Sequence, residues 1–343
     1  MSAPPGAPRR RTGGRAGILL MAPTLLLLAL VILYPLVDAV YLSFFKDAGL
    51  DESTGMFTEG GFAGVSNYTH WLLQRCGDAV CPPGTLGAQF YDAVWVTVFI
   101  TVVSVALEIA LGLWFAVIMN RRFRGRALVR AAILIPWAIP TAVTAKLFYF
   151  MLAYDGVVNR LLGGLGVEPV LWTSDPWAAT FAIIIADAWK TTPFMALLIL
   201  AGLQLIPPEV HESAQLDGAS KWQTFTRITL PMIKVPLMVA ILFRVMDGLR
   251  IYDLPAILTG GAGGTTSLSM LVIKQLRSGF HSAAALSTIV FVLLAFVAYL
   301  FVRHGGADVA ARSEALRRVR RPRARERSAN RPGTRKESET HAS

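Results

Sequence analysis

The feature that most constrains this chain is a series of long apolar runs. Residues 18–37 carry no charged side chain, and a helix of about 20 apolar residues is long enough to cross a bilayer. The whole chain is 54% hydrophobic and only 16% charged. That balance is typical of polytopic membrane proteins and not of soluble globular ones. The sequence therefore predicts an all-α membrane protein.

Six runs are expected to be transmembrane helices. They cover residues 18–37, 93–119, 127–152, 177–205, 228–258 and 284–302. Residues 267–283 are expected to form a short half-inserted helix. A signal peptide is a competing interpretation of the first run, but the run is longer than a usual h-region and lacks a small-x-small cleavage site. We therefore expect it to be retained as a span.

The formal net charge of +11 resides at the two ends of the chain. Arg9, Arg10, Arg11, Arg15 and the Arg-rich segment from Arg303 onward account for all of it. Basic segments flanking apolar spans are what the positive-inside rule expects of cytoplasmic termini, so nucleic-acid binding is not needed to explain the charge. The same rule places the loops 120–126 and 206–227 inside and the loops 46–90, 154–176 and 259–283 outside.

These observations predict three regions. Residues 1–15 form a disordered basic N-terminus, residues 16–305 form the transmembrane domain, and residues 306–343 form a disordered Arg-rich cytoplasmic tail. Anionic membrane lipid is the expected partner of the tail.

A polar insert, residues 206–231, separates the fourth and fifth spans. Pro207 and Pro208 stand where a helix can begin, and Glu209 falls in its first turn, where a carboxylate complements the helix dipole. Gly218 fits the position just past the end of such a helix. A second helix should then bury the apolar residues at three-residue spacing, Trp222, Phe225 and Ile228. On physical grounds alone, the insert is either a lever that fits a partner's groove or an ordinary cytoplasmic loop.

The amino-acid sequence of this insert resembles the EAA loop of binding-protein-dependent ABC importer permeases of the sugar family. The matching positions are Glu212, Ala214, Asp217, Gly218, Ala219, Trp222, Phe225, Ile228, Leu230 and Pro231. Ser213 departs from the family's alanine but is also small. The resemblance implies that the helix around Glu212, Ser213, Ala214, Asp217, Gly218 and Ala219 couples the spans to an ATPase.

Further segments carry the same resemblance over about residues 16–303. GFAGVSNY (residues 61–68), FRGRALVRAAILIPWAIP (123–140), the pair Gly156 and Asn159, and GGAGGTT (260–266) are similar to family motifs, with Ala262 in place of a proline. AIPTAVTAKLFYFM (138–151) and WKTTPF (189–194) look most like disaccharide permeases of the maltose and trehalose kind.

The resemblance implies a permease subunit of an ATP-driven carbohydrate importer in a bacterial plasma membrane, working by alternating access. The implied partners are a second homologous permease, two ATPase subunits and an extracellular substrate-binding lipoprotein. The chain has no G-x-x-x-x-G-K-[ST] motif, so no cofactor is expected on it, and ATP and Mg²⁺ would be bound by the ATPases. Glycerol-3-phosphate and oligosaccharide permeases share these motifs and remain alternatives. The rival of another class is a polytopic membrane enzyme, for which Asp187 and Asp247 offer a carboxylate pair.

Polar and aromatic side chains within the spans are candidates for the substrate path, because ionisable residues in a membrane usually face a cavity or a partner. At about 1.5 Å per residue, three spans bring them to one level in the outer half of the membrane. The candidates are Trp137, Lys146, Tyr149, Asp187, Trp189, Lys190, Arg244, Asp247 and Arg250. Alternatively, Arg244 pairs with Asp247 at i, i+3, and Lys146 and Arg250 reach the outer headgroups. Glu108 is interpreted as an interhelical hydrogen-bonding group.

Cys76 and Cys81 are the only cysteines. In an outward-facing loop they are either joined in a disulfide or left as two thiols. No metal site is expected, because the segment offers too few ligands and the histidines lack ligand spacing. The histidines are His70, His211, His281, His304 and His341.

Overall fold

The computed structural model describes residues 13–50, 55–77, 79–121 and 123–303. Residues 1–12 of the expected N-terminal region and the whole expected tail, residues 306–343, lie outside the described residues. Gly13, by contrast, already begins a helix.

Four helices among the described residues are long and apolar enough to cross a membrane. They are Leu20–Leu42, Gly87–Asn120, Pro176–Gln204 and Phe280–Arg303. Two bent pairs, Arg126–Ala138 with Thr141–Met151 and Lys221–Met232 with Lys234–Gly248, bring the number to six if each pair is one span. The predicted all-α polytopic class is confirmed, and the predicted six spans correspond to the upper count.

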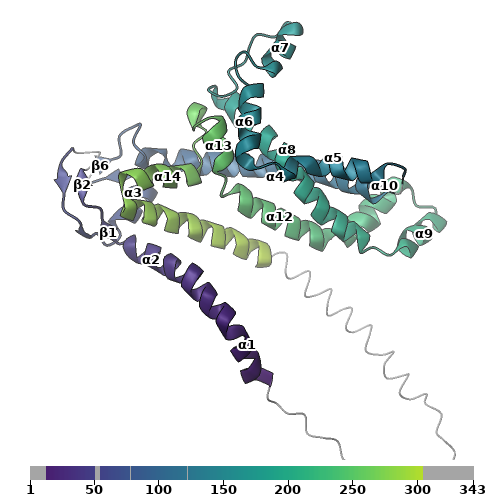
Figure 1. The fold of residues 1–343 in the computed structure, drawn as a ribbon, viewed down its shortest axis with the longest axis horizontal. Coiled ribbons are helices and arrows are strands. Elements are labelled where there is room, and N and C mark those ends of the chain that lie inside the picture. The colour runs from purple at the N-terminus through teal and green to yellow at the C-terminus, as the bar shows by residue number, and fades with distance from the viewer. Residues whose placement is uncertain (1–12, 51–54, 78, 122, 304–343) are drawn as a thin grey trace, which may run out of the picture.

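The first span diverges from the rest of the molecule (Figure 1). It consists of α1 (Gly13–Leu28), a π-helical turn (Ala29–Leu33) and α2 (Tyr34–Leu42). None of its most apolar stretch is buried against the rest of the chain. Packing within this chain therefore does not fix its position.

Three helices form the packed centre, α4 (Phe90–Asn120), α8 (Pro176–Gln204) and α12 (Lys234–Gly248). Glycines bring their backbones close together, since a Cβ on Gly112 would lie 2.8 Å from Met195 and one on Gly248 would lie 2.9 Å from Thr101. Small residues at crossings are the usual means of packing helices in lipid, where apolar burial alone gives no driving force. These glycines fix the separation of α4 from α8 and α12.

The predicted third span, residues 127–152, is not one straight helix. It consists of α5 (Arg126–Ala138) and α6 (Thr141–Met151), which meet at an angle of 93°. Ile139 between them has an extended backbone, as expected for a residue that precedes a proline, here Pro140. The bend was not part of the prediction, because the apolar character of a segment indicates its environment and not its direction. Helix α7 (Val157–Gly164) follows α6.

The predicted fifth span, residues 228–258, is also broken. It begins within a π-helical turn (Phe225–Thr229) and continues through α11 (Leu230–Met232), α12 and α13 (Asp253–Leu258), and helix α10 (Lys221–Thr224) precedes it. The helices before and after Ile233 are bent by 67°. A 3₁₀ turn (Ala262–Gly264), α14 (Leu268–Ser278) and the last helix, Phe280–Arg303, complete the described chain.

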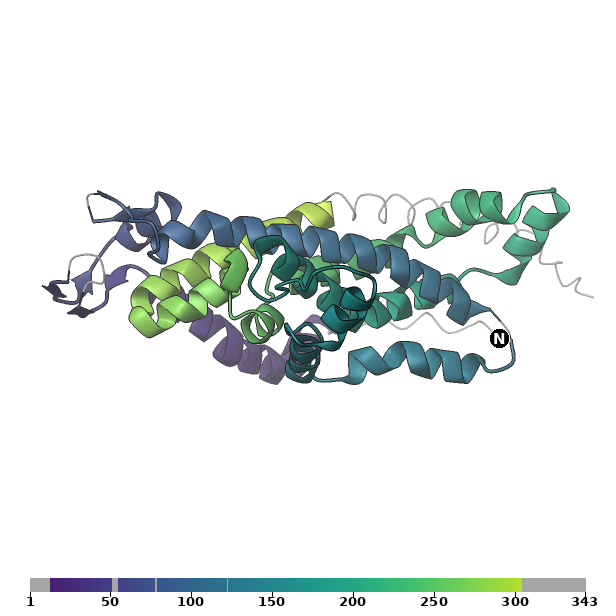
Figure 2. The ribbon, with the colours of Figure 1, turned by 90° about the horizontal axis from the view of Figure 1, so that it is seen from above.

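Short strands and one helix form a strand cap, which we define as the described residues between 43 and 89. Its pairs are all antiparallel: β1 (Phe45–Lys46) with β4 (Gly61–Phe62), β2 (Gly49–Leu50) with β3 (Phe57–Thr58), and β5 (Arg75–Cys76) with β6 (Ala79–Val80). The strand cap also contains α3 (Ser66–Leu72) and a 3₁₀ turn (Gly87–Gln89). Figures 1 and 2 show the strand cap at one end of α4, with α10 and helix α9 (Pro208–Leu216) at the other.

Candidate functional site

A buried ion cluster joins the three central helices. Arg244 on α12 donates through Nε to Oε2 of Glu108 on α4, 2.5 Å away. Its Nη2 donates to Oδ2 of Asp187 on α8 at 2.8 Å. Its Nη1 reaches Oδ2 of Asp247, one turn along α12, at 2.5 Å. The guanidinium therefore contacts carboxylates from all three helices.

Burial makes this cluster a strong constraint. The side chains of Arg244 and Glu108 are 2% and 0% exposed, whereas that of Asp247 is 72% exposed. Breaking a buried ion pair by removing one partner leaves an uncompensated charge in a medium that solvates it poorly. The cluster therefore holds α4, α8 and α12 in one register, and Asp247 is its accessible member.

Glu108 was expected to be an interhelical hydrogen-bonding group, and the structure places it in this way. Thr191 on α8 also donates to its Oε1, at 2.7 Å. Its link to Arg244 was not anticipated. The signal was available, because at about 1.5 Å per residue Glu108 lies about 18 Å from Asn120 and Arg244 lies about 20 Å from Pro231, which is nearly the same depth.

Lys190 on α8 reaches the break between α5 and α6 with its side chain. Its Nζ lies 2.5 Å from the carbonyl oxygen of Ile139, to which it donates. Ile139 has left the helix, so its carbonyl needs another hydrogen-bond donor in a membrane. Lys190 supplies that donor from α8 and ties the bend to the centre.

The remaining path candidates lie on the surface of the chain. Trp137 stacks on Phe194 with ring centroids 5.9 Å apart, and Lys146 lies over the ring of Tyr149 at 5.2 Å. Trp189 meets Phe148 edge to face, and it is 37% exposed. Arg250, just past α12, is also exposed. The structure brings Asp187, Arg244 and Asp247 into one cluster, while these other candidates are dispersed around it.

The coupling stretch, residues 206–231, begins with α9, which ends in a left-handed turn. Gly218 has φ of +76°, a conformation that favours glycine. The N–H of Gly218 donates to Gln215 at 3.1 Å, and the N–H of Ala219 donates to Ala214 at 3.0 Å. This pair of bonds is a Schellman motif, and it places Gly218 where the sequence predicted. No heavy atom lies within 4 Å of the space that a Cβ on Gly218 would occupy.

A capping box starts α10. The side chain of Ser220 accepts from the N–H of Gln223 at 3.3 Å, and the Gln223 side chain accepts from the N–H of Ser220 at 2.8 Å. The predicted buried face was wrong, since Trp222 is 72% exposed and the buried positions are Thr224 and Thr229. The π-helical turn at Phe225–Thr229 changes the register on which the three-residue spacing depended.

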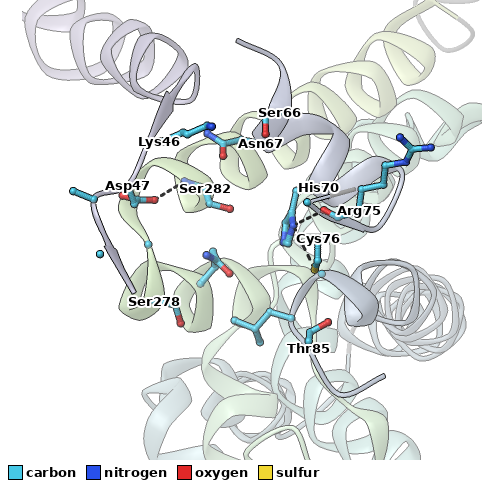
Figure 3. A pocket seen from close by; sticks show the side chains of 17 residues that line it. Lys46, Asp47, Ser66, Asn67, His70, Arg75, Cys76, Thr85, Ser278 and Ser282 are labelled. Carbon is cyan, nitrogen blue, oxygen red and sulfur yellow. Dashed lines mark hydrogen bonds between the residues drawn. The ribbon is translucent and has the colours of Figure 1, made fainter. Parts of the chain in front are cut away.

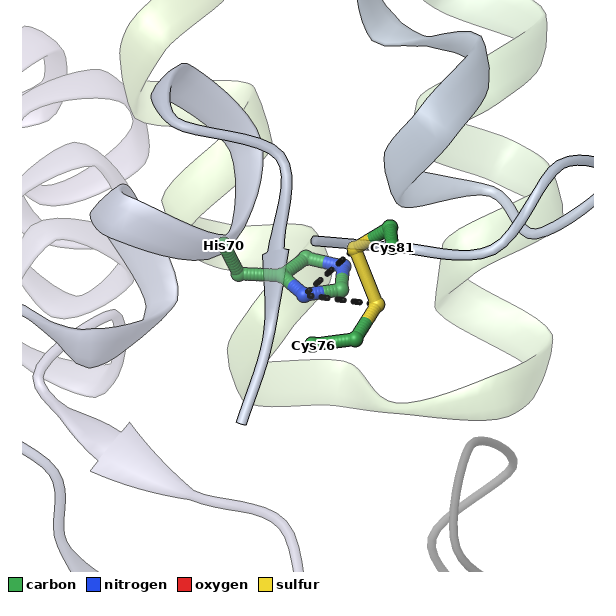
Figure 4. Close-up of side chains that lie close together, drawn as sticks. All are labelled: His70, Cys76 and Cys81. Carbon is green, nitrogen blue, oxygen red and sulfur yellow. Dashed lines mark hydrogen bonds between the residues drawn. A yellow bond between two sulfur atoms is a disulfide. The ribbon is translucent and has the colours of Figure 1, made fainter. Parts of the chain in front are cut away.

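The strand cap holds the two cysteines, which are joined in a disulfide (Figure 4). His70 lies beside them, with its Nδ1 3.9 Å from Sγ of Cys76. Because both sulfurs are bonded to each other, the group offers a single imidazole to a metal ion. The expectation that the chain binds no metal stays a prediction.

A polar cavity of about 360 Å³ lies between the strand cap, α14 and the start of the last helix (Figure 3). The carboxylate of Asp47 accepts from the backbone N–H of His281 at 3.0 Å and of Ser282 at 3.2 Å. Trp71 donates to the carbonyl of Ser282 at 3.1 Å. On α14, partial burial lowers the pKa of Lys274, whose Nζ donates to the hydroxyl of Thr266. The contacts of Asp47 and Trp71 fasten the strand cap to the beginning of the last helix.

Comparisons with known proteins place this geometry in a family. Residues 108–308 match the model described as "Binding-protein-dependent transport system inner membrane component". The trehalose/maltose transport system permease protein MalF of Thermococcus litoralis is 40% identical over 84% of this chain and 93% of its own length. The trehalose transport system permease protein SugA of Mycobacterium tuberculosis is 35% identical over 87% of this chain and 92% of its own length. The sulfoquinovosyl glycerol transport system permease protein SmoG of Agrobacterium fabrum is 37% identical over 83% of this chain and 89% of its own length.

Among solved structures, a bacterial ABC transporter that imports the acidic polysaccharide alginate has the same fold. Its chain superposes with a TM-score of 0.69 at 21% identity and covers 85% of this chain and 96% of its own length. Each of these relatives is a transport component and not an enzyme, so the membrane-enzyme alternative is set aside.

Proposed function

Because this chain belongs to the family of inner membrane components of binding-protein-dependent transport systems, we propose that it is the permease subunit of an ATP-driven carbohydrate importer. The observation that carries the proposal is α9 with its glycine turn, at the end of α4 opposite the strand cap. A short rigid helix that leaves the spans and turns back at an open glycine can enter a groove of a cytoplasmic ATPase. The strand cap then faces the extracellular binding protein.

The substrate class follows from the named relatives. Two of the three transport trehalose or trehalose and maltose by name, so we propose a disaccharide of that kind. The surface of the central helices offers flat aromatic side chains and an accessible carboxylate, which suit a sugar's apolar faces and hydroxyls. Trp189 and Asp247 are the residues that we expect to contact it.

An anionic sugar derivative is the second candidate, and two observations favour it. SmoG carries sulfoquinovosyl glycerol in its name. Lys146 and Arg250 are both exposed on this chain, and each could pair with a phosphate or sulfonate.

The proposed mechanism is alternating access. ATP-driven closure of two partner ATPase subunits pushes on α9, and the spans of this chain and of a second, homologous permease open outward to accept sugar. Hydrolysis reverses the movement and releases sugar inward. ATP and Mg²⁺ stay on the ATPases. The ion cluster of Arg244 joins three helices, so these helices move together as one body.

The test is Gly218→Asp in cells that carry the whole system. Aspartate tolerates a left-handed backbone better than most residues do, so the turn should survive while bulk and charge enter the space beside it. We expect radiolabelled trehalose uptake to collapse and the ATPase subunits to be lost from affinity-purified permease.

Gly166→Asp is the matched control, because Gly166 has φ of +80° and equally open surroundings but lies in the predicted outward loop. It should retain the ATPases. Equal retention by both variants would show that α9 is not the docking element. Competition by unlabelled glycerol-3-phosphate and not by trehalose would favour the anionic substrate.

A further inference from the structure

A large cavity lies where α4 meets the coupling stretch. Its volume is about 890 Å³. One wall is a single face of α4, formed by Ala110, Leu113, Trp114, Val117 and Arg121. The facing wall consists of residues 218–222 with Thr224, Phe225 and Thr229, and His211 and Gln215 of α9 lie beside it. The cavity therefore touches both a span and the proposed coupling element.

Charge is distributed unevenly along the cavity. The α4 wall is apolar from Ala110 to Val117 and ends in Arg121, and Lys221 stands on the facing wall. Among the described residues that line the cavity none carries a carboxylate. Within the described part of the chain, no ion pair involves Arg121 or Lys221. Arg121 and Lys221 thus line an apolar trough as two cations, and within the described residues neither has an ion-pair partner.

The dimensions of the α4 wall match one leaflet of a bilayer. From Ala110 to Arg121 the helix rises about 16 Å, and half of the hydrocarbon core is about 15 Å. Trp114 and Trp222, 59% and 72% exposed, are of the residue type enriched where acyl chains meet headgroups. An apolar trough of this depth that ends in two cations is complementary to a lipid with a negative headgroup.

We propose that this cavity binds one anionic phospholipid. Its phosphate lies between Arg121 and Lys221, and an acyl chain lies along Leu113, Trp114 and Val117. The inference rests on the proposed function only in placing the coupling stretch at the cytoplasmic membrane surface, where such basic pockets meet anionic headgroups. A bound lipid bridges α4 and α10 and braces the coupling stretch against the span.

The experiment is native mass spectrometry of the complete transporter, with phosphatidylglycerol or phosphatidylcholine added to detergent-purified complex. Arg121→Gln/Lys221→Gln removes the headgroup contacts. Arg124→Gln/Arg126→Gln is the matched control, since it also removes two charges, both close in sequence to Arg121, and neither residue lines the cavity. At about 1 kcal/mol for each cation near a charged headgroup, the first pair should weaken phosphatidylglycerol binding roughly 30-fold, and the control should not.

A second variant guards against misfolding of the first. Ala110→Trp leaves both cations in place and fills the deep, apolar end of the cavity, so it should also lose the bound lipid. Equal retention of phosphatidylglycerol in the Gln pair and its control would overturn the proposal. Equal retention of phosphatidylcholine by the wild type would overturn the requirement for an anionic headgroup.

Occupation of the cavity by a neighbouring protein would also overturn the proposal, and cysteine labelling would detect it. Leu113→Cys would then stay protected from a maleimide in the intact complex after lipid extraction, and become reactive only when the partner permease is removed. These outcomes are independent of the proposed function, because the bound lipid is counted by mass whether or not the ATPases co-purify or trehalose is taken up.

Discussion

The centre of the molecule and the coupling stretch hold their shapes in opposite ways. At the crossing of α4, α8 and α12, a buried guanidinium contacts carboxylates from all three helices, and glycines bring the backbones together. In the coupling stretch, Trp222 is exposed and the shape comes from local backbone bonds, a Schellman turn and a capping box. The contrast suggests that changes at the centre mainly alter stability, whereas changes in the coupling stretch mainly alter transport.

The largest effect should follow from Arg244→Met. Without the guanidinium, Glu108 and Asp187 remain buried without their cation, and we expect the free energy of unfolding to fall by about 3–5 kcal/mol. The measurement is the fraction of chain that remains monodisperse on size-exclusion chromatography after stepwise heating in detergent. Arg250→Met removes an exposed arginine close by and should melt like the wild type. Similar melting of the two variants would mean that the cluster does not hold the centre together.

Gly112→Leu should come next. A Cβ at Gly112 would lie 2.8 Å from Met195 and 3.3 Å from the backbone nitrogen of Ala196, so α4 and α8 must separate. Overpacking of this kind lowers stability by about 1–3 kcal/mol. Gly163→Leu, in α7 where nothing lies within 4 Å, is the control and should leave the same heating profile unchanged.

Gly218→Val should show the opposite pattern to that of the two central variants. A β-branched residue disfavours the left-handed turn by about 1–2 kcal/mol. The chain then cannot turn back after α9 in the same way, while the packing of α4, α8 and α12 stays unchanged. We expect uptake to fall about tenfold or more with an unchanged heating profile. Gly218→Asn, which tolerates the turn, should retain more uptake than Gly218→Val. A lowered melting temperature for Gly218→Val would show that the two regions are not separable.

Ser220→Ala should have the smallest effect. Loss of an N-cap side chain weakens a helix end by about 1 kcal/mol, and α10 is only the four residues Lys221–Thr224. Hydrogen exchange of the amides of α10 should quicken, while amides of α4 and α8 stay protected. Unchanged exchange at Gln223, whose N–H loses its acceptor, would argue that the capping box does not stabilise this end.

The fold class, the span segments and the turn at Gly218 could be predicted because each depends on local sequence. Apolar length marks a span, and a glycine after a capped helix marks its end. The two bends at Pro140 and Ile233 could not be predicted in the same way, because a broken helix and a straight one have the same composition. Pro136 and Pro140 in one span were the available hint.

The central cluster was predictable only in part. The pairing of Arg244 with Asp247 follows from their separation by one helical turn, and the structure has it. The contacts of Arg244 with Glu108 and Asp187 depend on how three helices are rotated about their axes, which spacing along the chain does not determine. Lys190 is a similar case, since its hydrogen bond to Ile139 exists only because α5 ends there. The shared buried face of Trp222, Phe225 and Ile228 was mispredicted. The π-helical turn at Phe225–Thr229 adds a residue to the turn, which a regular three-residue spacing does not anticipate.

The unburied first span has a consequence for how the chain behaves before assembly. Lipid tails solvate an apolar helix about as well as another helix does, so α1 and α2 gain little by folding back onto α4. In the isolated chain, the tilt of this span and its rotation about the helix axis are then not fixed. The neighbouring helix in the finished complex determines both. A pair of spin labels, one on α2 and one on α8, would report a broad distance distribution for the lone subunit and a narrow one after assembly.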